Sequence, residues 1–367
     1  MLTLILKAND SCNLRCAYCS VGDKTHSGMM TQDEMTSALL WFADLAGERE
    51  EHNPSIIFHG GEPLLIPVRQ YRNCLEELFS HSPDLKFTLN IQTNGTILTD
   101  EILSLLIDYD IKPGISIDGP ESVHDSQRRD VFSMCTYSRI ISNIKTMKAQ
   151  GIKPSGLMVL THNSLNAGLD FLKDFADMNL PLKINPLYSA GEAVKHEELF
   201  LKSGEYAEYL IRVFEYVIDN EIDISLMPIE YILQGVLNAK TPRGCVFSGK
   251  CSQSFICVSH DGNIYPCGRF ADDRTNLLGN VHAGGITDSG REILRRLTAS
   301  RSINLRSECT GCKYKTFCNG GCIAHNGSMC HDFMKFMDYL YGEGIRKYKA
   351  YLLKRRDEIL YRLGHAV

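Results

Sequence analysis

Short apolar segments alternate with longer amphipathic segments over the first two-thirds of the chain. The short segments have the length and composition of β-strands; they are Leu2–Lys7, Ser55–Phe58, Lys86–Ile91, Pro113–Ile117, Ser155–Leu160 and Leu182–Leu187. The amphipathic segments have the apolar spacing of helices; they are Gln32–Leu45, Val68–Phe79, Asp100–Ile107, Tyr137–Ala149, Leu165–Ala176 and Ser203–Val217. Thr31 and Glu34 have the spacing of a capping box, which predicts that the first helix starts at Gln32.

Six strand–helix units in series predict a parallel sheet with right-handed crossovers. This number favours an open barrel over a closed eight-fold one, so we expect an α/β fold with a partial (β/α)6 barrel over residues 1–225. Ligands of such sheets gather where the carboxyl ends of the strands meet. The loops that follow the predicted strands are therefore the first places to look for chemistry.

The composition changes beyond the barrel. Residues 245–330 contain nine of the fourteen cysteines, which indicates a domain organised by metal rather than by a large apolar core. With its lead-in we place this domain at residues 226–335. The tail, residues 336–367, is predicted to be helical, and the basic residues on one of its sides are Arg346, Lys347, Lys349, Lys354, Arg355 and Arg356. A solvated helix face is the simple interpretation, and a docking surface for an acidic peptide is the alternative.

Charge and length exclude some classes of protein. The net charge is −5 over 367 residues, which gives no reason to expect a nucleic-acid partner. The first residues, Met1–Leu6, lack the basic start of a signal peptide, and no apolar run has the length of a membrane span. Fourteen cysteines without an export signal argue for metal ligation in a cytoplasmic protein, with no membrane partner.

Three cysteines follow the first predicted strand with the spacing C-x3-C-x2-C: Cys12, Cys16 and Cys19. Cysteine thiolates are the usual ligands of a [4Fe–4S] cluster, which has four irons. Three thiolates leave one iron open to a chelating small molecule. A zinc loop is the alternative, although zinc sites usually pair cysteines as C-x2–4-C and need a fourth ligand nearby.

This cysteine loop, with Tyr18 directly before its third cysteine, resembles that of the radical S-adenosylmethionine (SAM) superfamily. The resemblance implies that the open iron binds the amino and carboxylate groups of SAM. It also implies that a reduced cluster cleaves SAM to a 5′-deoxyadenosyl radical, which abstracts hydrogen from an inert C–H bond.

Further motifs of the same family follow the next strands. The run His59-Gly60-Gly61-Glu62-Pro63 resembles the GGEP motif, which implies SAM contacts for Gly60, Gly61, Glu62 and Pro63. Gln92–Gly95, Ser116–Pro120 and His124–Arg128 are similar to motifs that contact the carboxylate and ribose of SAM. The residues implied there are Asn94, Ser116 and Arg128. Ordinary turn chemistry is the alternative for each motif taken alone.

The C-terminal cysteines resemble the SPASM domain of peptide- and protein-modifying radical SAM enzymes. The resemblance implies a first auxiliary [4Fe–4S] cluster on Cys245, Cys251, Cys267 and Cys322, and a second on Cys309, Cys312, Cys318 and Cys330. The chain would then carry three clusters, and a zinc ribbon is the alternative for this domain. Three cysteines remain, and we expect them to be buried apolar residues: Cys74 and Cys135 in helices and Cys257 in a strand.

The SPASM resemblance implies a polypeptide substrate. In anaerobic sulfatase-maturating enzymes an Asp follows the cysteine equivalent to Cys267 and acts as a base, whereas this chain has Gly268. We therefore predict a maturase of ribosomally made precursor peptides that installs a thioether or carbon–carbon crosslink. The alternatives are a sulfatase-maturating (formylglycine-forming) enzyme, a peptide epimerase, a small-molecule dehydrogenase, or a non-catalytic iron–sulfur or zinc protein.

The expected partners follow from this function. They are a precursor peptide and an electron donor such as flavodoxin or ferredoxin. Because the chain starts almost at once with a barrel strand, we expect no N-terminal leader-binding module, and a separate protein could then supply leader recognition. The residue types alone identify no catalytic acid or base.

Overall fold

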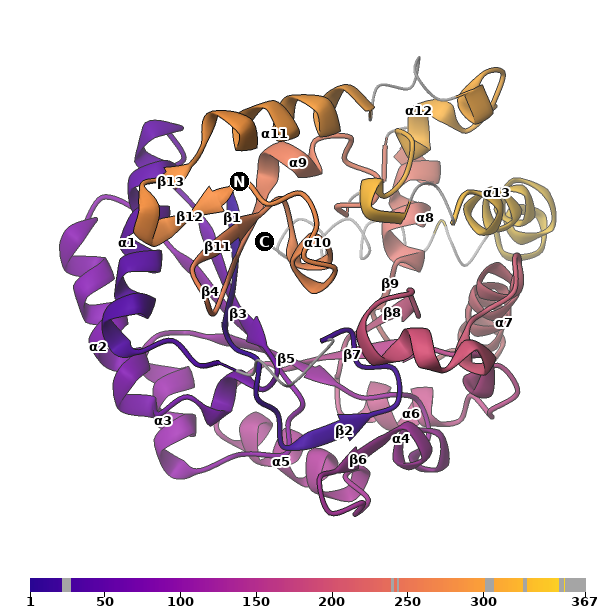
Figure 1. Cartoon of the computed structure of the whole chain (residues 1–367). Coiled ribbons are helices and arrows are strands. Elements are labelled where there is room, and N and C mark those ends of the chain that lie inside the picture. Colours follow the sequence, from indigo (N-terminus) through magenta and orange to yellow (C-terminus); the bar gives the residue numbers. More distant parts are fainter. Residues whose placement is uncertain are drawn as a thin grey trace.

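The computed structural model describes residues 1–21, 28–238, 241–242, 244–300, 307–325, 329–349 and 353. In this part of the chain one curved sheet of eleven strands has the order β13-β12-β11-β10-β1-β3-β4-β5-β7-β8-β9 (Figure 1). Six successive parallel neighbours form the barrel wall: β1 (Thr3–Asn9), β3 (Ser55–Gly60), β4 (Thr88–Thr93), β5 (Lys112–Ser116), β7 (Ser155–Leu160) and β8 (Leu182–Pro186). The predicted partial (β/α)6 barrel is confirmed.

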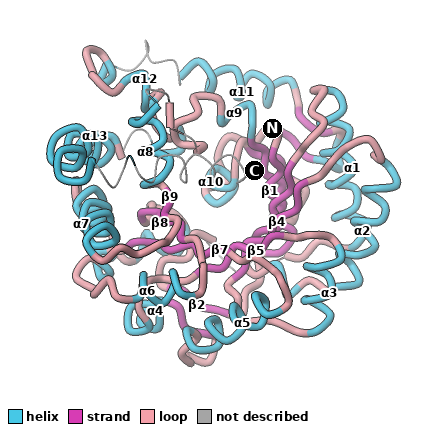
Figure 2. The backbone as a smooth tube through the Cα atoms, turned by 180° about the vertical axis from the view of Figure 1, so that it is seen from behind, coloured by secondary structure: helices cyan, strands magenta, loops and turns pink. Residues whose placement is uncertain are grey.

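Helices surround the strands on the outside (Figure 2). They are α1 (Gln32–Glu48), α2 (Val68–His81), α3 (Asp100–Asp108), α4 (Glu121–Gln127), α5 (Tyr137–Ala149), α6 (Phe171–Asp177) and α7 (Glu205–Asp219). The capping box at the start of α1 is present: the Thr31 side chain accepts from the Glu34 backbone N–H, and the Glu34 side chain accepts in return from that of Thr31.

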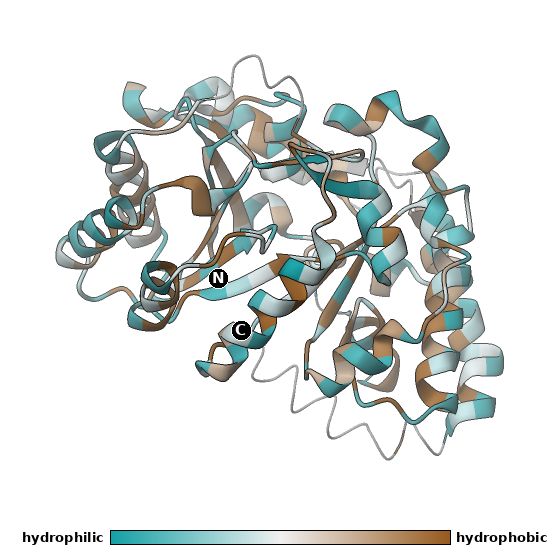
Figure 3. Cartoon of the chain, turned by 90° about the horizontal axis from the view of Figure 1, so that it is seen from below, coloured by the Kyte–Doolittle hydropathy of each residue, from teal (hydrophilic) through white to brown (hydrophobic). Residues whose placement is uncertain are grey.

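Successive side chains along each strand point alternately to an outer core and to the barrel interior. On β1, Leu4 and Leu6 are fully buried in the core that α1 and α2 cover, whereas Lys7 points to the opposite face. Figure 3 shows apolar residues concentrated on the strands and the inward faces of the helices. Polar groups on the interior face therefore need partners there, and these groups form the candidate site.

Two local predictions were wrong. The helix expected over Leu165–Ala176 begins only at Phe171, after a 3-10 turn, η3 (His162–Ser164). Cys135 is exposed in a loop rather than buried in a helix. The reason is a distant cap: the Asp125 carboxylate accepts from the backbone N–H groups of Thr136 and Tyr137, at 2.9 and 3.0 Å, so α5 starts after Cys135.

The cysteine-rich region continues the barrel sheet. Its strand β10 (Phe255–Ser259) pairs in parallel with β1, and β11 (Asn263–Tyr265), β12 (Gly279–Asn280) and β13 (Gly285–Ile286) follow as antiparallel neighbours. At the other edge, β9 (Leu226–Met227) pairs with β8. Cys257 on β10 and Cys74 on α2 are fully buried, as predicted. The sheet therefore crosses the boundary predicted at residue 225, and the division into domains stays a prediction.

The remaining helices of the C-terminal region are α8 (Ile229–Asn238), α9 (Cys251–Ser254), α10 (Gly268–Asp272), α11 (Asp288–Ser300), α12 (Lys315–Cys318) and α13 (Cys330–Tyr339). The expected tail helix begins with α13 and continues through a π-helical turn, Leu340–Gly344, with Arg346, Lys347 and Lys349 exposed. Lys354, Arg355 and Arg356 lie outside the described residues. Among the helices that are described, none has both the length and the apolar character of a membrane span.

Candidate active site

The cysteine loop leaves the carboxyl end of β1 and is held by a short antiparallel pair, β2 (Leu14–Cys16) with β6 (Arg128–Asp130). Cys16 is the register partner of Arg128. Burial raises the pKa of the Cys16 thiol to about 12; Arg128 lowers it, and the neighbouring Cys19 and Cys12 raise it. The three cysteine sulfurs thus lie close enough for their thiolate charges to repel one another. The positive charge of cluster iron would offset this repulsion.

Gly60 and Gly61 let the end of β3 lie directly against the cysteine loop. A Cβ atom at Gly60 would be 2.1 Å from the Asn9 carbonyl oxygen, and one at Gly61 would be 2.3 Å from that of Ser11. The Gly61 N–H donates to the Asn9 carbonyl at 2.6 Å. Gly60 also has a φ of +129°, a conformation that other residues rarely adopt. Both glycines are therefore required for the close packing of these two loops.

Glu62 joins three loops and is completely buried. Its carboxylate accepts from the Leu64 N–H at 3.0 Å, the Thr93 hydroxyl at 2.6 Å and the Asn94 N–H at 2.7 Å. Burial raises the pKa of this carboxyl group although these hydrogen bonds oppose the rise. Both carboxylate oxygens are used within the protein, so the side chain orders the ends of β3 and β4. Any contact of Glu62 or its neighbour Pro63 with SAM stays a prediction.

Asn94 and Ser116 lie at the ends of β4 and β5. The Asn94 amide N–H₂ donates to the Asn13 side-chain oxygen at 2.8 Å and lies 3.8 Å from the Cys12 sulfur. Asn94 is thus brought to the cysteine loop itself. The Ser116 hydroxyl accepts from the Gln92 side chain at 3.2 Å, which leaves its own hydrogen to donate to a ligand.

Tyr18, Asp118 and Arg128 form a buried network beside Cys16. The Tyr18 hydroxyl donates to the Asp118 carboxylate and accepts from Arg128 Nη1 at 2.7 Å. The Arg128 guanidinium also lies 5.7 Å from the centre of the Tyr18 ring. In the part of the chain that the structure describes, the buried Nε–H of Arg128 has no hydrogen-bond partner. A donor of this kind beside the cysteine loop fits an anionic group such as the SAM carboxylate.

Sequence reasoning missed the roles of Asp118 and His124. The His124 ring accepts from the Asp118 backbone N–H at 3.1 Å and pairs with the Thr136 hydroxyl at 3.0 Å. Both residues lie inside motifs singled out from the sequence, so the signal was present. Their function as internal supports, however, depends on contacts between loops that the sequence does not show.

His124 predicts an acid-sensitive fold. Burial, with a smaller effect of Arg128, lowers the pKa of His124 to about 3. The unfolded chain binds a proton near pH 6.5, so stability rises with pH between these values and is lost as the pH falls from about 6.5 toward 3. At pH 5 we expect His124 to reduce the free energy of unfolding by about 2 kcal/mol relative to pH 7.

Urea unfolding at pH 7 and pH 5 checks this expectation. His124→Asn should unfold with a smaller difference between the two pH values than the parent chain. The exposed His52 provides the matched control, and His52→Asn should keep the parent difference. An unchanged pH dependence in His124→Asn would contradict the assignment.

The C-terminal cysteines form two groups. In the first, the Cys267 thiol lies beside Cys322, and Arg269 Nη1 donates to the Cys322 sulfur at 3.8 Å and also interacts with Cys245. Cys251 is half-buried at the start of α9. In the second, burial raises the pKa of Cys318 to about 11, and the thiols that add to this rise are those of Cys330, Cys309 and Cys312. The thiols that the structure brings together belong to the same predicted sets, and the placement of Cys251 in the first set and the ligation of either cluster stay predictions.

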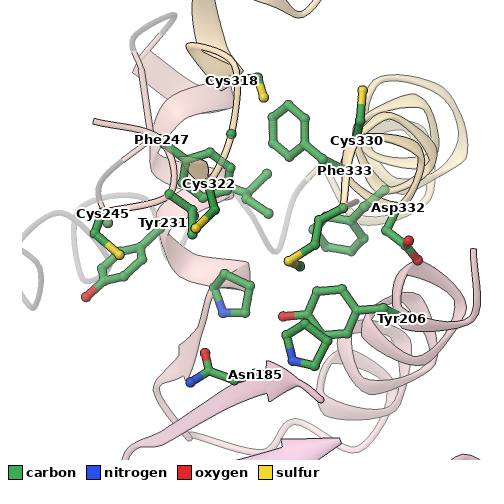
Figure 4. A pocket seen from close by; sticks show the side chains of 18 of the residues that line it. Asn185, Tyr206, Tyr231, Cys245, Phe247, Cys318, Cys322, Cys330, Asp332 and Phe333 are labelled. Carbon is green, nitrogen blue, oxygen red and sulfur yellow. The ribbon is translucent and has the colours of Figure 1, made fainter. Parts of the chain in front are cut away.

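A cavity of about 360 Å³ lies between these groups. Figure 4 shows Cys245 and Cys322 on one side of it and Cys318 and Cys330 on the other. Among the described residues, no three His, Cys, Asp or Glu side chains converge on a point that could hold one metal ion.

Comparison with known proteins agrees with this geometry. The Radical SAM superfamily matches residues 7–174. A cysteine-type anaerobic sulfatase-maturating enzyme of Clostridium perfringens is 26% identical over 365 residues, covering 93% of this chain and 96% of the relative. A serine-type enzyme of Klebsiella aerogenes is 26% identical over 341 residues, covering 89% and 82%.

Solved structures show the same fold. The structure of anSMEcpe with bound AdoMet has a TM-score of 0.81 at 23% identity and covers 99% of this chain and 98% of its own. SuiB of Streptococcus suis bound to the precursor peptide SuiA has a TM-score of 0.64 at 16% identity and covers 88% and 72%. Residues 7–174 therefore form a radical SAM domain, and the protein is an enzyme whose cofactors are SAM and [4Fe–4S] clusters.

Proposed function

We propose that this enzyme oxidises a Cys or Ser side chain of a protein substrate to formylglycine, the reaction of a sulfatase-maturating enzyme. The observation that carries the proposal is the end-to-end match with cysteine-type and serine-type enzymes, which covers the barrel and the cysteine-rich region together. The sequence prediction ranked crosslinking first because Gly268 replaces an expected Asp. The relatives support the alternative better.

The residues of the site belong to two parts of the chain, the cysteine loop with the strand ends beside it and the C-terminal thiol groups. SAM on its reduced cluster supplies a radical that removes a hydrogen atom from the substrate. Cys12, Cys16 and Cys19 would hold this cluster, and the ends of β3, β4 and β5 would orient SAM. The two C-terminal thiol groups would hold clusters that accept the second electron of the oxidation. Peptides bound in the related structures of anSMEcpe support a peptide as the substrate.

Mass spectrometry tests the proposal. The enzyme, reconstituted anaerobically, is incubated with SAM, reductant and the peptide Cp18Cys or Kp18Cys, each also made with Ser or Ala at the target position. The Ser peptide should lose two hydrogens, and the Cys peptide should also exchange its sulfur for oxygen. Both products should react with a hydrazide, which requires an aldehyde, and the Ala peptide should remain unchanged.

Crosslinking of a precursor peptide is the second candidate, because Gly268 lacks the carboxylate expected after Cys267. A product that loses two hydrogens, does not react with hydrazide and fragments as a joined residue pair would favour it over formylglycine formation. A separate leader-binding protein and a flavodoxin or ferredoxin donor stay predictions. SAM cleavage without any change in Cys, Ser or precursor peptides would overturn both candidates.

A further inference from the structure

A buried ion pair crosses the barrel interior between β1 and the helix that follows Cys267. The Lys7 ammonium contacts the Asp272 carboxylate, and the two side chains are 6% and 5% exposed. The Tyr188 hydroxyl donates to the other Asp272 oxygen at 2.8 Å. Lys7 lies in register with His59 of β3 and Ser259 of β10. The hydrogen bonds that order the SAM site use neither Lys7 nor Asp272.

Asp272 lies between the two parts of the redox machinery. On one side, Lys7 precedes the cysteine loop on β1, and Tyr188 is hydrogen-bonded to Ser20, which directly follows Cys19. On the other side, Arg269 of the same helix as Asp272 lies 4.6 Å from the centre of the Tyr188 ring and contacts the Cys322 sulfur.

Figures 1 and 2 show α10, which carries Asp272, inside the ring of strands. A substrate must lie within reach of SAM at the cysteine loop, and its second electron leaves toward the auxiliary thiol groups. Through Tyr188 and Lys7 on one side and Arg269 on the other, the carboxylate of Asp272 lies between the cysteine loop and the Cys322 thiol.

Stability alone does not account for this pair. Removing two charges from water costs several kcal/mol per ion in general, and apolar residues of similar volume often serve as well or better. Burial lowers the pKa of Lys7, but Asp272, Cys257 and Asp10 together raise it by more, so Lys7 stays charged. His59, whose pKa burial lowers to about 4, is neutral beside them. The carboxylate of Asp272, bonded to Lys7 and Tyr188, thus lies between the cysteine loop and the C-terminal thiol groups, where a proton acceptor is needed.

We propose that Asp272 accepts the substrate proton during the oxidation, in the role that Gly268 leaves open, while its contacts with Lys7 and Tyr188 hold the carboxylate in place. The inference rests on the proposed function. After a hydrogen atom leaves the substrate Cβ, the carbon radical gives one electron to an oxidised auxiliary iron–sulfur cluster, and the S–H or O–H gives its proton to Asp272. A C=S or C=O bond forms, and water converts the thioaldehyde to the aldehyde with release of hydrogen sulfide. Because loss of the electron makes the S–H or O–H proton strongly acidic, a carboxylate paired with Lys7 is basic enough.

Asp272→Asn separates proton acceptance from hydrogen abstraction. With a peptide deuterated at the target Cβ, the variant should still transfer deuterium to 5′-deoxyadenosine. Formation of the oxidised product should fall by about 10²–10⁴-fold, the usual contribution of a positioned base. Asp272→Glu should recover part of this loss. Asp273→Asn, an exposed neutralisation one residue further on, is the matched control and should keep the parent rate.

A second variant controls for the destabilisation that an unpaired Lys7 charge would cause in Asp272→Asn. The double variant Lys7→Gln with Asp272→Asn removes both charges and should retain its iron and its deuterium transfer while showing the same loss of product. Product formation within threefold of the parent in either variant would overturn the inference, as would loss of deuterium transfer from both folded variants. A parent enzyme that makes a crosslink instead of an aldehyde would refute the proposed function alone, since the ratio of variant to parent product still tests Asp272.

Discussion

Replacing Cys12, Cys16 and Cys19 together with alanine is expected to abolish the reductive cleavage of SAM. The three thiols lie within eight residues that follow β1 and include β2, and the C-terminal thiol groups lie on other elements and do not depend on them. Iron bound per chain should therefore fall by about one third, the share of one cluster in three. Iron analysis and chromatographic detection of 5′-deoxyadenosine measure the two effects.

Cys135→Ala is the control for this experiment. Its thiol is exposed and belongs to none of the three cysteine groups, so iron content and SAM cleavage should match those of the parent chain. Full iron content in the triple variant, or continued formation of 5′-deoxyadenosine, would show that another part of the chain holds the SAM-binding cluster.

Arg128→Met is expected to destabilise the fold and loosen the cysteine loop. Burial raises the pKa of the Asp118 carboxyl group, and Arg128 is the largest influence that lowers it. Without Arg128, the Asp118 carboxylate is left buried beside Tyr18 without its cation, which costs about 3–5 kcal/mol of unfolding free energy. Because Arg128 is also the register partner of Cys16, SAM binding should weaken and the iron of the first cluster should become easier to remove with a chelator.

Two further variants show whether loss of the Arg128 charge causes the destabilisation. Arg128→Met combined with Asp118→Asn removes both charges and should be more stable than Arg128→Met alone. Arg139→Met, an exposed change on α5, should change the free energy of unfolding by less than about 0.5 kcal/mol. Anaerobic urea unfolding and equilibrium dialysis with SAM provide the measurements. If Arg128→Met lowers the free energy of unfolding by less than about 1 kcal/mol, the buried Asp118 carboxylate does not depend on this guanidinium for its stabilisation.

The sequence predicted the barrel because its signals are local. The strand Ser155–Leu160 and the helix Tyr137–Ala149 have the predicted bounds, and Thr31 and Glu34 form the predicted cap. The start of α6 was not predictable in the same way. Residues 165–170 have helical periodicity, yet the chain turns there before Phe171. Likewise, Asp125 limits α5 from a distance in sequence, and this left Cys135 exposed.

The sequence identified those residues of the candidate site whose spacing along the chain is characteristic of their chemistry. Cys12, Cys16 and Cys19 lie on one short loop, so their spacing alone identified them. The contribution of Glu62 was less accessible: its motif was recognised, but the structure shows a carboxylate that joins strand ends within the protein. Asp272 carried no signal in the sequence, because an aspartate near a short helix is usually solvated.

The sequence by itself determined the class of this protein from a strand–helix repeat, a loop of three cysteines and a cysteine-rich C-terminal region, each readable from neighbouring residues. Only the tertiary structure decided which polar groups meet. It placed β10 beside β1, brought α10 into the barrel and thereby buried Asp272 against Lys7 and Tyr188, more than 80 residues distant along the chain. Local propensities act over a few residues, whereas the charge and proton chemistry of a site depends on contacts that form only when the whole sheet has assembled.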